Sequence, residues 1–141
     1  MNNCIFCKII NRELPASIIH EDDQVIAFMD IQPVNPGHIL VVPKIHREFI
    51  AELDEDLTSG MFNVAAKINR ALRKSDIRSE GINYFLADGE AAGQEVFHTH
   101  LHIFPRFRND GFGLRFGERY SVLPDRKELD EVCTSIKKMM E

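Results

Sequence analysis

The chain has 141 residues, of which 44% are hydrophobic and 28% charged, and its 17 Lys and Arg against 22 Asp and Glu give a net charge of −5. This length and composition predict one globular domain over residues 1–141, with a core of its own. The acidic balance excludes a broad basic surface for nucleic acid, and no apolar run is long enough to span a membrane. The polar start does not resemble a signal peptide, so we expect a cytoplasmic protein.

The first half of the chain alternates between short apolar runs and turn residues. Residues 4–10 are typical of a short helical or irregular segment, which Pro15 brings to an end. The apolar runs 18–20 and 25–29, joined by three acidic residues, predict a β-hairpin. After a loop that contains proline and glycine, residues 38–42 are rich in β-branched side chains and predict a buried strand.

The middle of the chain predicts one long helix and two more strands. Apolar residues recur at steps of three and four over residues 57–72, and Asp54 or Asp56 can cap the helix that this periodicity predicts. Residues 82–86 and 96–104 are typical of strands, and a small, polar loop separates them.

A last helix is predicted after Pro124 and Asp125. Its apolar face would carry Leu129, Val132, Cys133, Ile136 and Met140. We therefore expect Cys133 in the core or in an interface. With no repeat and no linker, the predicted fold class is α+β, in which helices cover a mostly antiparallel sheet.

Three histidines alternate with other residues in His98-Thr99-His100-Leu101-His102. Because side chains alternate across a strand, all three would lie on one face. A single histidine there would fit the solvated side of a strand, but three at this period are improbable by chance. One zinc ion bound by all three rings is disfavoured, since the outer two Cα atoms lie roughly 13 Å apart at about 3.3 Å per residue. At least one ring should stay free for catalysis.

Cys4 and Cys7 form a Cys-x-x-Cys pair almost at the start of the chain. A thioredoxin-like redox pair would instead follow a strand and open a helix, so metal binding is the better interpretation. His46 and His98 are candidate partners, and two thiolates with two imidazoles would complete a closed, structural zinc site. His20 and His38 stand alone, and we expect them to be surface or turn residues without an assigned role.

Two regions together resemble the histidine-triad (HIT) family. The segment from Asp30 to His46 contains DIQPVNPGH followed by LVVPKIH, which is similar to the nucleotide-binding half of that family. Gly93-Gln94 and the stretch from His98 to Ile103 are similar to its catalytic half. The resemblance covers nearly the whole chain, and it is specific because unrelated segments would have to match in the right order.

The resemblance implies a HIT-like fold, a homodimer in which two sheets join, and a purine nucleotide or nucleotide conjugate as ligand. It implies that His100 is the nucleophile, with His102 beside it at the phosphate, and that Asp30 accepts hydrogen bonds from the ribose. The other nucleotide-binding residues that it implies are Phe6, Phe28, Ile31, Gly93 and Gln94. The zinc-bearing branch of the family matches as well, with Cys4, Cys7, His46 and His98 as ligands.

The reaction that follows is attack of a neutral His100 imidazole on the α-phosphorus, which gives a nucleotidyl-histidine that water then resolves. His102 could hydrogen-bond the phosphate or help to protonate the leaving group. A nucleoside phosphoramidate or a related nucleotide is the leading substrate. The alternatives are dinucleoside polyphosphate hydrolysis, nucleotidyl transfer, a nucleotide sensor with little turnover, and a hydrolase that uses a catalytic zinc.

Two residues depart from the resemblance near the expected phosphate. Close relatives that cleave phosphoramidates often have Asn where Ala87 stands and Ser where Glu95 stands. A carboxylate at Glu95 would repel a phosphate unless it points away. In that case, only main-chain N–H groups of residues 93–96 could donate to the ligand.

Overall fold

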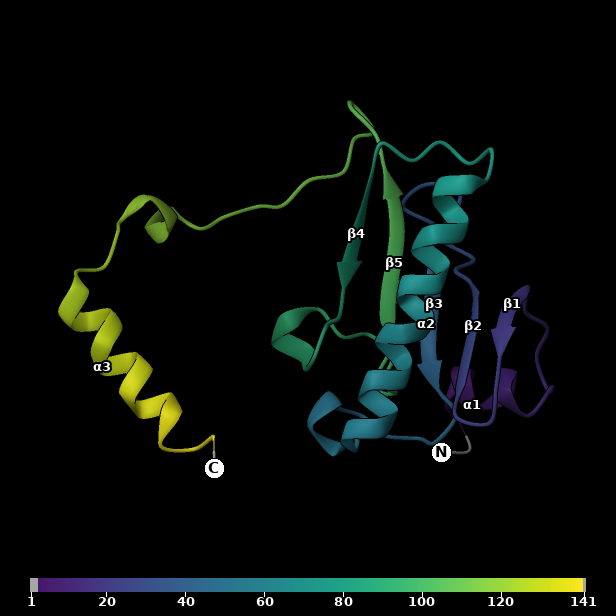
Figure 1. Ribbon diagram of the computed structural model, residues 1–141, viewed down its shortest axis with the longest axis horizontal. Helices are drawn as coiled ribbons and strands as arrows, with labels where there is room; N and C mark the ends of the chain where they lie inside the picture. Colours follow the sequence, from purple (N-terminus) through teal and green to yellow (C-terminus); the bar gives the residue numbers. More distant parts are fainter. Residues whose placement is uncertain (1–2, 141) are drawn as a thin grey trace. The chain divides into compact units, whose positions relative to one another are not determined.

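A computed structural model describes residues 3–140 of the chain, which divide after Asp110 into two compact units. The first unit is built on a five-stranded sheet in the order β1-β2-β3-β5-β4 (Figure 1). Every neighbouring pair of strands is antiparallel, as the sequence predicts. The strands are β1 (Ile18–Glu21), β2 (Val25–Met29), β3 (Ile39–Pro43), β4 (Gly81–Phe85) and β5 (Leu101–Arg106).

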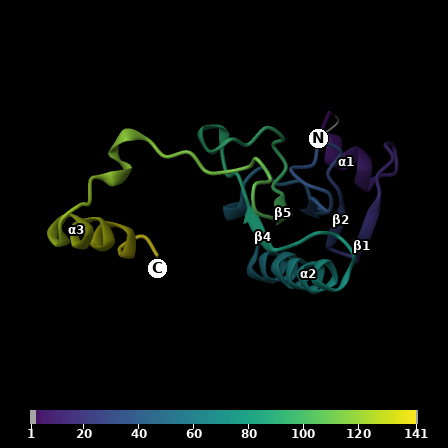
Figure 2. The same ribbon diagram turned by 90° about the horizontal axis from the view of Figure 1, so that it is seen from above.

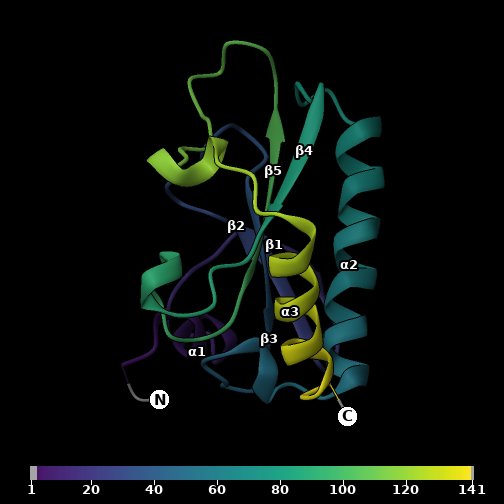
Figure 3. The same cartoon turned by 90° about the vertical axis from the view of Figure 1, so that its left-hand side faces the viewer.

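Two helices, α1 (Ile5–Ile10) and α2 (Glu55–Lys74), cover opposite faces of the sheet (Figures 2 and 3). The alternation of side chains along the strands supplies an apolar surface to both helices. In β3, Ile39 and Val41 belong to the core under α2, whereas Leu40 and Val42 pack with α1. The continuous apolar run of this strand therefore reflects burial on both faces.

The long helix α2 begins where its capping residue allows. The Asp54 side chain accepts a hydrogen bond from the Leu57 amide at 2.8 Å, so Asp54, and not Asp56, is the N-cap. The residues of the predicted periodicity are buried against the sheet, namely Leu57, Met61, Val64, Ala65, Ile68 and Leu72. Leu101 and Ile103 of β5 face α2, so His102 between them lies on the opposite face of the sheet.

The last strand of the sheet begins later than the sequence predicts. We expected a strand over residues 96–104, but β5 begins at Leu101, and residues 96–98 form a bend. Two of the groups that would continue the ladder are used elsewhere. The Thr99 amide donates to the Arg47 carbonyl at 2.7 Å, and the Pro43 carbonyl at the end of β3 lies 2.8 Å from Nε2 of His98. The expectation that one regular strand holds all three histidines is therefore wrong.

The second unit begins at Gly111 and contains α3 (Arg126–Lys137). Asp125 and Glu128 form a capping box at its start, as expected for a helix that begins at this point. All residues from 111 to 140 are exposed, including the apolar face of α3 and Cys133. Cys133 is thus not a core residue of the single chain, while its place in an interface and the single domain over residues 1–141 stay predictions. No helix within residues 3–140 is long and apolar enough to cross a membrane.

Candidate functional site

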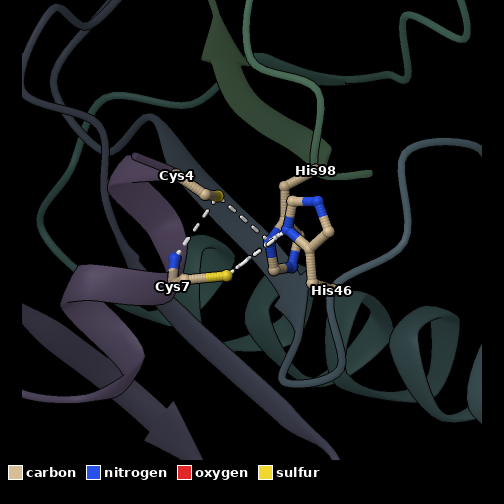
Figure 4. Close-up of side chains that lie close together, drawn as sticks. All are labelled: Cys4, Cys7, His46 and His98. Carbon is tan, nitrogen blue, oxygen red and sulfur yellow. Dashed lines mark hydrogen bonds between the residues drawn. The ribbon is translucent and has the colours of Figure 1, made fainter. Parts of the chain in front are cut away.

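Four side chains from three segments converge beside α1. Cys4 and Cys7 lie at the N-cap and in the first turn of α1, His46 follows β3, and His98 precedes β5 (Figure 4). The Nδ1 atoms of the two histidines lie 3.2 Å apart. The Cys7 sulfur lies 3.3 Å from Nδ1 of His46 and 3.6 Å from Nδ1 of His98, and the Cys4 sulfur lies 3.4 Å from Nδ1 of His98. A tetrahedron with bonds of about 2.0 Å to nitrogen and about 2.3 Å to sulfur has nitrogen–nitrogen edges of about 3.3 Å and nitrogen–sulfur edges of about 3.5 Å. The spacing of the four side chains thus fits one tetrahedral metal ion.

Hydrogen bonding leaves the correct nitrogen of His98 free to bind that metal. Nε2 of His98 lies 2.8 Å from the Pro43 carbonyl oxygen, which can only accept, so Nε2 carries the proton. The lone pair of Nδ1 then points toward the two sulfurs and His46. Burial lowers the pKa of His98 to about 4, so the ring is neutral, as ligation requires.

The surroundings of Cys7 do not stabilise a free thiolate. Cys4 caps α1, because its sulfur accepts a hydrogen bond from the Cys7 amide at 3.5 Å. Burial, followed by the hydrogen bond and charge of Cys4, raises the pKa of Cys7 to about 11. Reactive thiols in Cys-x-x-Cys redox motifs have a lowered pKa, so this environment favours a thiolate only when a cation lies beside it.

His100 is buried, with 6% of its surface exposed, and is oriented by its own chain. Its Nδ1 lies 2.8 Å from the His98 carbonyl oxygen and must donate to it. Among the described residues, none hydrogen-bonds Nε2 of His100, so the lone pair of this nitrogen is free. Burial lowers the pKa of His100, which keeps the ring neutral and therefore nucleophilic near neutral pH.

The expectation that His38 is a surface or turn residue without a role is wrong, because the ring is buried beside His102. Its ring is buried, with its Nδ1 3.0 Å from the Val34 amide and its Nε2 2.9 Å from Nδ1 of His102. Because the Val34 amide can only donate, Nδ1 of His38 accepts and its Nε2 carries the proton. Nε2–H of His38 therefore donates to Nδ1 of His102. In neutral His102 the proton is then on Nε2, which is free to donate to a ligand. The sequence signal that could have revealed this role is a histidine directly before an apolar run, residues 39–42, that predicts a buried strand.

His102 therefore acts as a neutral hydrogen-bond donor. Its ring centroid lies 4.8 Å from that of His100, so the two rings share the face of the sheet that was predicted for them. Burial, helped by the neighbouring His100 and His38, lowers the pKa of His102 to about 4. At neutral pH, the ring carries a single N–H that can reach a phosphate oxygen or a leaving group.

Asp30, His38 and His102 form a second group whose polar atoms lie within 4.8 Å of one another. Asp30 Oδ2 lies 3.5 Å from Nε2 of His38 and 3.9 Å from Nδ1 of His102. This group does not suit a metal, because Nε2 of His38 already carries a proton and cannot offer a lone pair. The carboxylate instead faces protonated or acceptor nitrogens and keeps lone pairs for another donor.

The residues expected around the base and ribose lie on the same side of the sheet as His100. Phe6 and Phe28 are buried and contact each other edge to face at 5.6 Å between ring centroids. Asp30 follows β2, and its Oδ1 accepts from the Gln32 amide at 2.8 Å. Ile31 next to it is 94% exposed, so its apolar side chain is available to a ligand. Contact of these residues with a nucleotide stays a prediction.

Gln94 connects the loop before the histidines to the segment that carries His46. Its Oε1 accepts from the Gly89 amide at 2.7 Å, and its Nε2 donates to the carbonyl oxygens of Glu48 at 2.8 Å and Val96 at 3.2 Å. The side chain is buried, and all three contacts are with main-chain groups. The predicted contact of Gln94 with nucleotide is untested, but its side chain has a structural role of its own.

The same loop offers two main-chain donors. The amides of Gly93 and Gln94 already donate to carbonyl oxygens within the loop, at 2.9 and 3.1 Å. Within residues 3–140, the amides of Glu95 and Val96 make no hydrogen bond. Of the main-chain N–H groups of residues 93–96, these two are therefore free to donate to a ligand. Ala87 is buried, and the Glu95 side chain is exposed.

Comparisons with known proteins agree with this geometry. The HIT domain model matches residues 11–109. A crystal structure of a HIT family member from Bacillus subtilis is 40% identical, with a TM-score of 0.89 over 99% of this chain and 98% of that chain. A Zn-bound histidine triad family protein from Mycobacterium smegmatis is 34% identical, with a TM-score of 0.75 over 95% of this chain and 98% of that one. The adenylylsulfatase HINT3 of Arabidopsis thaliana is 33% identical over 137 residues, which are 97% of this chain and 69% of that protein. The chain belongs to the histidine-triad family.

Proposed function

We propose that this protein is a nucleotide hydrolase that cleaves nucleoside phosphoramidates or related nucleotides at the α-phosphorus, through a nucleotidyl intermediate on His100. The observation that carries the proposal is the pair of fixed tautomers. His100 presents a free Nε2 lone pair because its Nδ1 donates to the His98 carbonyl oxygen, and His102 presents an N–H beside it. A nucleophile and a donor on one face are the two groups that attack at a phosphate needs.

In the first step, the Nε2 lone pair of His100 forms a bond to the α-phosphorus, and the bond to the leaving group breaks. The leaving group takes the bonding electron pair. A phosphoramidate nitrogen that has taken up one additional proton from solvent before the attack departs as a neutral amine. Nε2–H of His102 and the amides of Glu95 and Val96 donate to the phosphate oxygens. The His98 carbonyl oxygen accepts from Nδ1 of His100 and stabilises the positive charge that the ring gains.

In the second step, a water molecule attacks the same phosphorus. The bond from phosphorus to Nε2 breaks, its electron pair returns to His100, and the water loses a proton to solvent. The products are a nucleoside monophosphate and the free imidazole. His100 regains its starting tautomer, because Nδ1 keeps its proton and donates to the His98 carbonyl oxygen throughout.

The proposed ligand is a purine ribonucleotide or its conjugate. Asp30 stands at the end of β2, where its carboxylate keeps lone pairs that can accept from two ribose hydroxyls. Phe6 and Phe28 offer apolar ring surface to the base, and exposed Ile31 can close over it. We assign Gly93 and Gln94 to the phosphate side of the site through the loop that they shape.

We propose that the metal is zinc and that its role is structural. Two thiolates and two imidazoles are donors that zinc prefers, and four protein ligands leave no position for water or substrate. Bound zinc would hold α1, the His46 segment and His98 together. It supplies no group to the reaction, and the chemistry belongs to His100 and His102.

A homodimer is the proposed assembly. Within residues 3–140, β4 has a strand neighbour on one side only, and its Tyr84 and Phe85 are 42% and 43% exposed. The second unit adds further apolar residues that a single chain leaves exposed, among them Leu123, Val132 and Ile136. A second copy is the partner that would cover both. The three cysteines without a disulfide partner suit a reducing compartment, and we propose the cytoplasm.

Dinucleoside polyphosphate hydrolysis and nucleotidyl transfer are the nearest alternatives, because they share the first step. A nucleotide sensor with little turnover is a third. The relative that is named an adenylylsulfatase supports turnover over sensing, and it adds an adenylyl sulfate to the substrates that deserve trial.

The test is direct observation of the intermediate. The protein is mixed with adenosine phosphoramidate, a diadenosine polyphosphate, an adenylyl sulfate or a nucleotide sugar, quenched during turnover and examined by mass spectrometry. We expect a nucleotidyl adduct on His100. An adduct on His102, or the absence of any adduct or product with all four compounds, would overturn the proposal. The relative rates separate the substrate classes.

A further inference from the structure

Phe6 lies between the candidate metal ligands and the proposed nucleophile, with ring contacts to both His98 and His100. It lies within the Cys4 to Cys7 turn, whose two sulfurs face His46 and His98. The ring is 6% exposed and belongs to the apolar cluster under α1, which also contains Ile9 and Phe28. It also contacts His98 and His100, so it joins this cluster to the two candidate sites.

The ring of Phe6 contacts the proposed nucleophile directly. Its centroid lies 4.9 Å from that of His100, and the two planes meet at 74°, an edge-to-face contact. A second, weaker contact of the same kind reaches His98 at 5.9 Å. The ring also contacts Phe28 edge to face, with 5.6 Å between the centroids. Edge-to-face pairs at these separations are favourable beyond the area that they bury.

His100 needs such a support because one hydrogen bond does not fix an imidazole. The bond from Nδ1 to the His98 carbonyl oxygen leaves the ring able to swing about that contact. Attack on phosphorus requires the Nε2 lone pair to be aligned to within a fraction of an ångström. The Phe6 ring packed against the imidazole restricts this motion.

We propose that Phe6 is a positioning residue for His100, and that the metal acts on catalysis by holding the α1 turn so that Phe6 stays against the imidazole. The inference rests on the proposed function, in which His100 attacks the substrate. Metal and nucleophile are then connected by two routes, the His98 main chain and the Phe6 ring. Only the second route passes through a side chain that can be changed without removing a metal ligand.

The rival role for Phe6 is as a wall of the base pocket alone. The two roles predict different measurements. A wall contributes to the binding of the nucleotide, so its loss raises the dissociation constant and leaves the chemical step unchanged. A positioning residue affects the chemical step, so its loss slows formation of the adduct at saturating nucleotide.

The experiment compares Phe6→Leu with Ile9→Val in the metal-loaded full chain. Ile9 is the matched control because it is buried on the same helix and in the same cluster. None of the contacts of His100 involves it. Three quantities are measured, namely nucleotide affinity, the single-turnover rate of adduct formation, and relaxation dispersion of the His100 Cε1–H signal, which reports exchange between ring orientations.

For Phe6→Leu, we expect a single-turnover rate that is about tenfold to a hundredfold lower, as for misplacement by about 1 Å, together with new exchange at His100. Ile9→Val should change neither. Removal of the metal from the wild-type protein should produce the same exchange signal as Phe6→Leu.

Weaker nucleotide binding at an unchanged single-turnover rate would overturn the inference, as would equal slowing by Ile9→Val or a His100 signal without exchange in Phe6→Leu. If the wild-type protein forms no adduct with any nucleotide, the proposed function fails. The exchange measurement needs no substrate, and it still decides whether Phe6 and the metal hold the His100 ring.

Discussion

Two groups of polar side chains in this protein have the close spacing of a metal site. One is the metal group of Cys4, Cys7, His46 and His98, and the other is the reaction group of Asp30, His38 and His102, which adjoins His100. In both groups, the polar atoms lie within 4.8 Å of one another. Proximity alone therefore does not separate them.

The difference lies in which ring nitrogen a main-chain group occupies. His98 donates through Nε2 to the Pro43 carbonyl oxygen, so its Nδ1 lone pair is free for a metal. His100, two residues later, donates through Nδ1 to the His98 carbonyl oxygen, so its Nε2 lone pair is free for attack. In His38, the Val34 amide takes the lone pair instead, so only a proton is left to offer. One main-chain partner thus decides whether a histidine is a ligand, a nucleophile or a donor.

The largest effect is expected at His100, which adjoins the reaction group. His100→Ala should lower turnover by several orders of magnitude, because it removes the atom that forms the covalent bond, while nucleotide binding persists. His102→Ala should lower turnover less, since it removes one donor to the phosphate. Steady-state rates and nucleotide affinities of both variants are the measurement. Near-normal turnover in His100→Ala would remove the distinction between nucleophile and donor.

In the metal group, we expect one zinc per chain in the wild-type protein. Cys7→Ser should lower this zinc content and the melting temperature. Three segments lose their common ligand, and binding of such a metal contributes to folding. Metal analysis of freshly purified protein and thermal unfolding at equal protein concentration are the measurements. His38→Gln is the matched control, and it should keep the zinc. A wild-type metal content near zero, with an unchanged melting temperature in Cys7→Ser, would reject the site.

The pH dependence of stability tests the neutral state of His102. Burial lowers the pKa of His102 to about 4, whereas an unfolded histidine has a pKa of about 6.5. Between these values, the unfolded chain binds more protons, so this contribution to stability is present above about pH 6.5 and is lost as the pH falls toward 4. From pH 7 to pH 5, the wild-type protein should lose about 2 kcal/mol more than His102→Asn.

Urea unfolding of both proteins at equal zinc concentration measures this difference, because the metal group is the same in each and cancels. Equal losses in the two proteins would mean that His102 is charged, or solvated, in the folded state.

The smallest effect is expected at Asp30. Asp30→Ala should weaken the binding of a purine ribonucleotide by about tenfold, since hydrogen bonds to a carboxylate contribute on the order of 1.5 kcal/mol. Binding of the 2′,3′-dideoxy analogue should change little, and the zinc content should stay the same. Calorimetric titration with both nucleotides is the measurement. Equal losses for both would show that Asp30 does not contact the ribose, and a loss of metal would place it in the wrong group.

Much of this fold is predictable because its signals are local. The three- and four-residue periodicity of residues 57–72 matches α2, and the apolar runs match β1, β2 and β3 to within about one residue. The start of β5 was not predictable, because it depends on the Thr99 amide reaching the Arg47 carbonyl oxygen, a contact between distant segments. His38 was missed for a similar reason, since only the pairing of β3 with β5 brings its ring to His102.

The sequence by itself determined the inventory of the site: the family, the two cysteines and four of the histidines, and the idea that metal and nucleophile belong to separate rings. Residue type and spacing are enough for that, because they fix which donors exist. Only the tertiary structure decided which nitrogen of each ring is free, and that Phe6 lies against His100. The group that hydrogen-bonds one ring nitrogen decides whether the other nitrogen keeps a lone pair or a proton. For His98 that group is the carbonyl of Pro43, from a distant segment, and for His38 it is the amide of Val34, from the preceding loop.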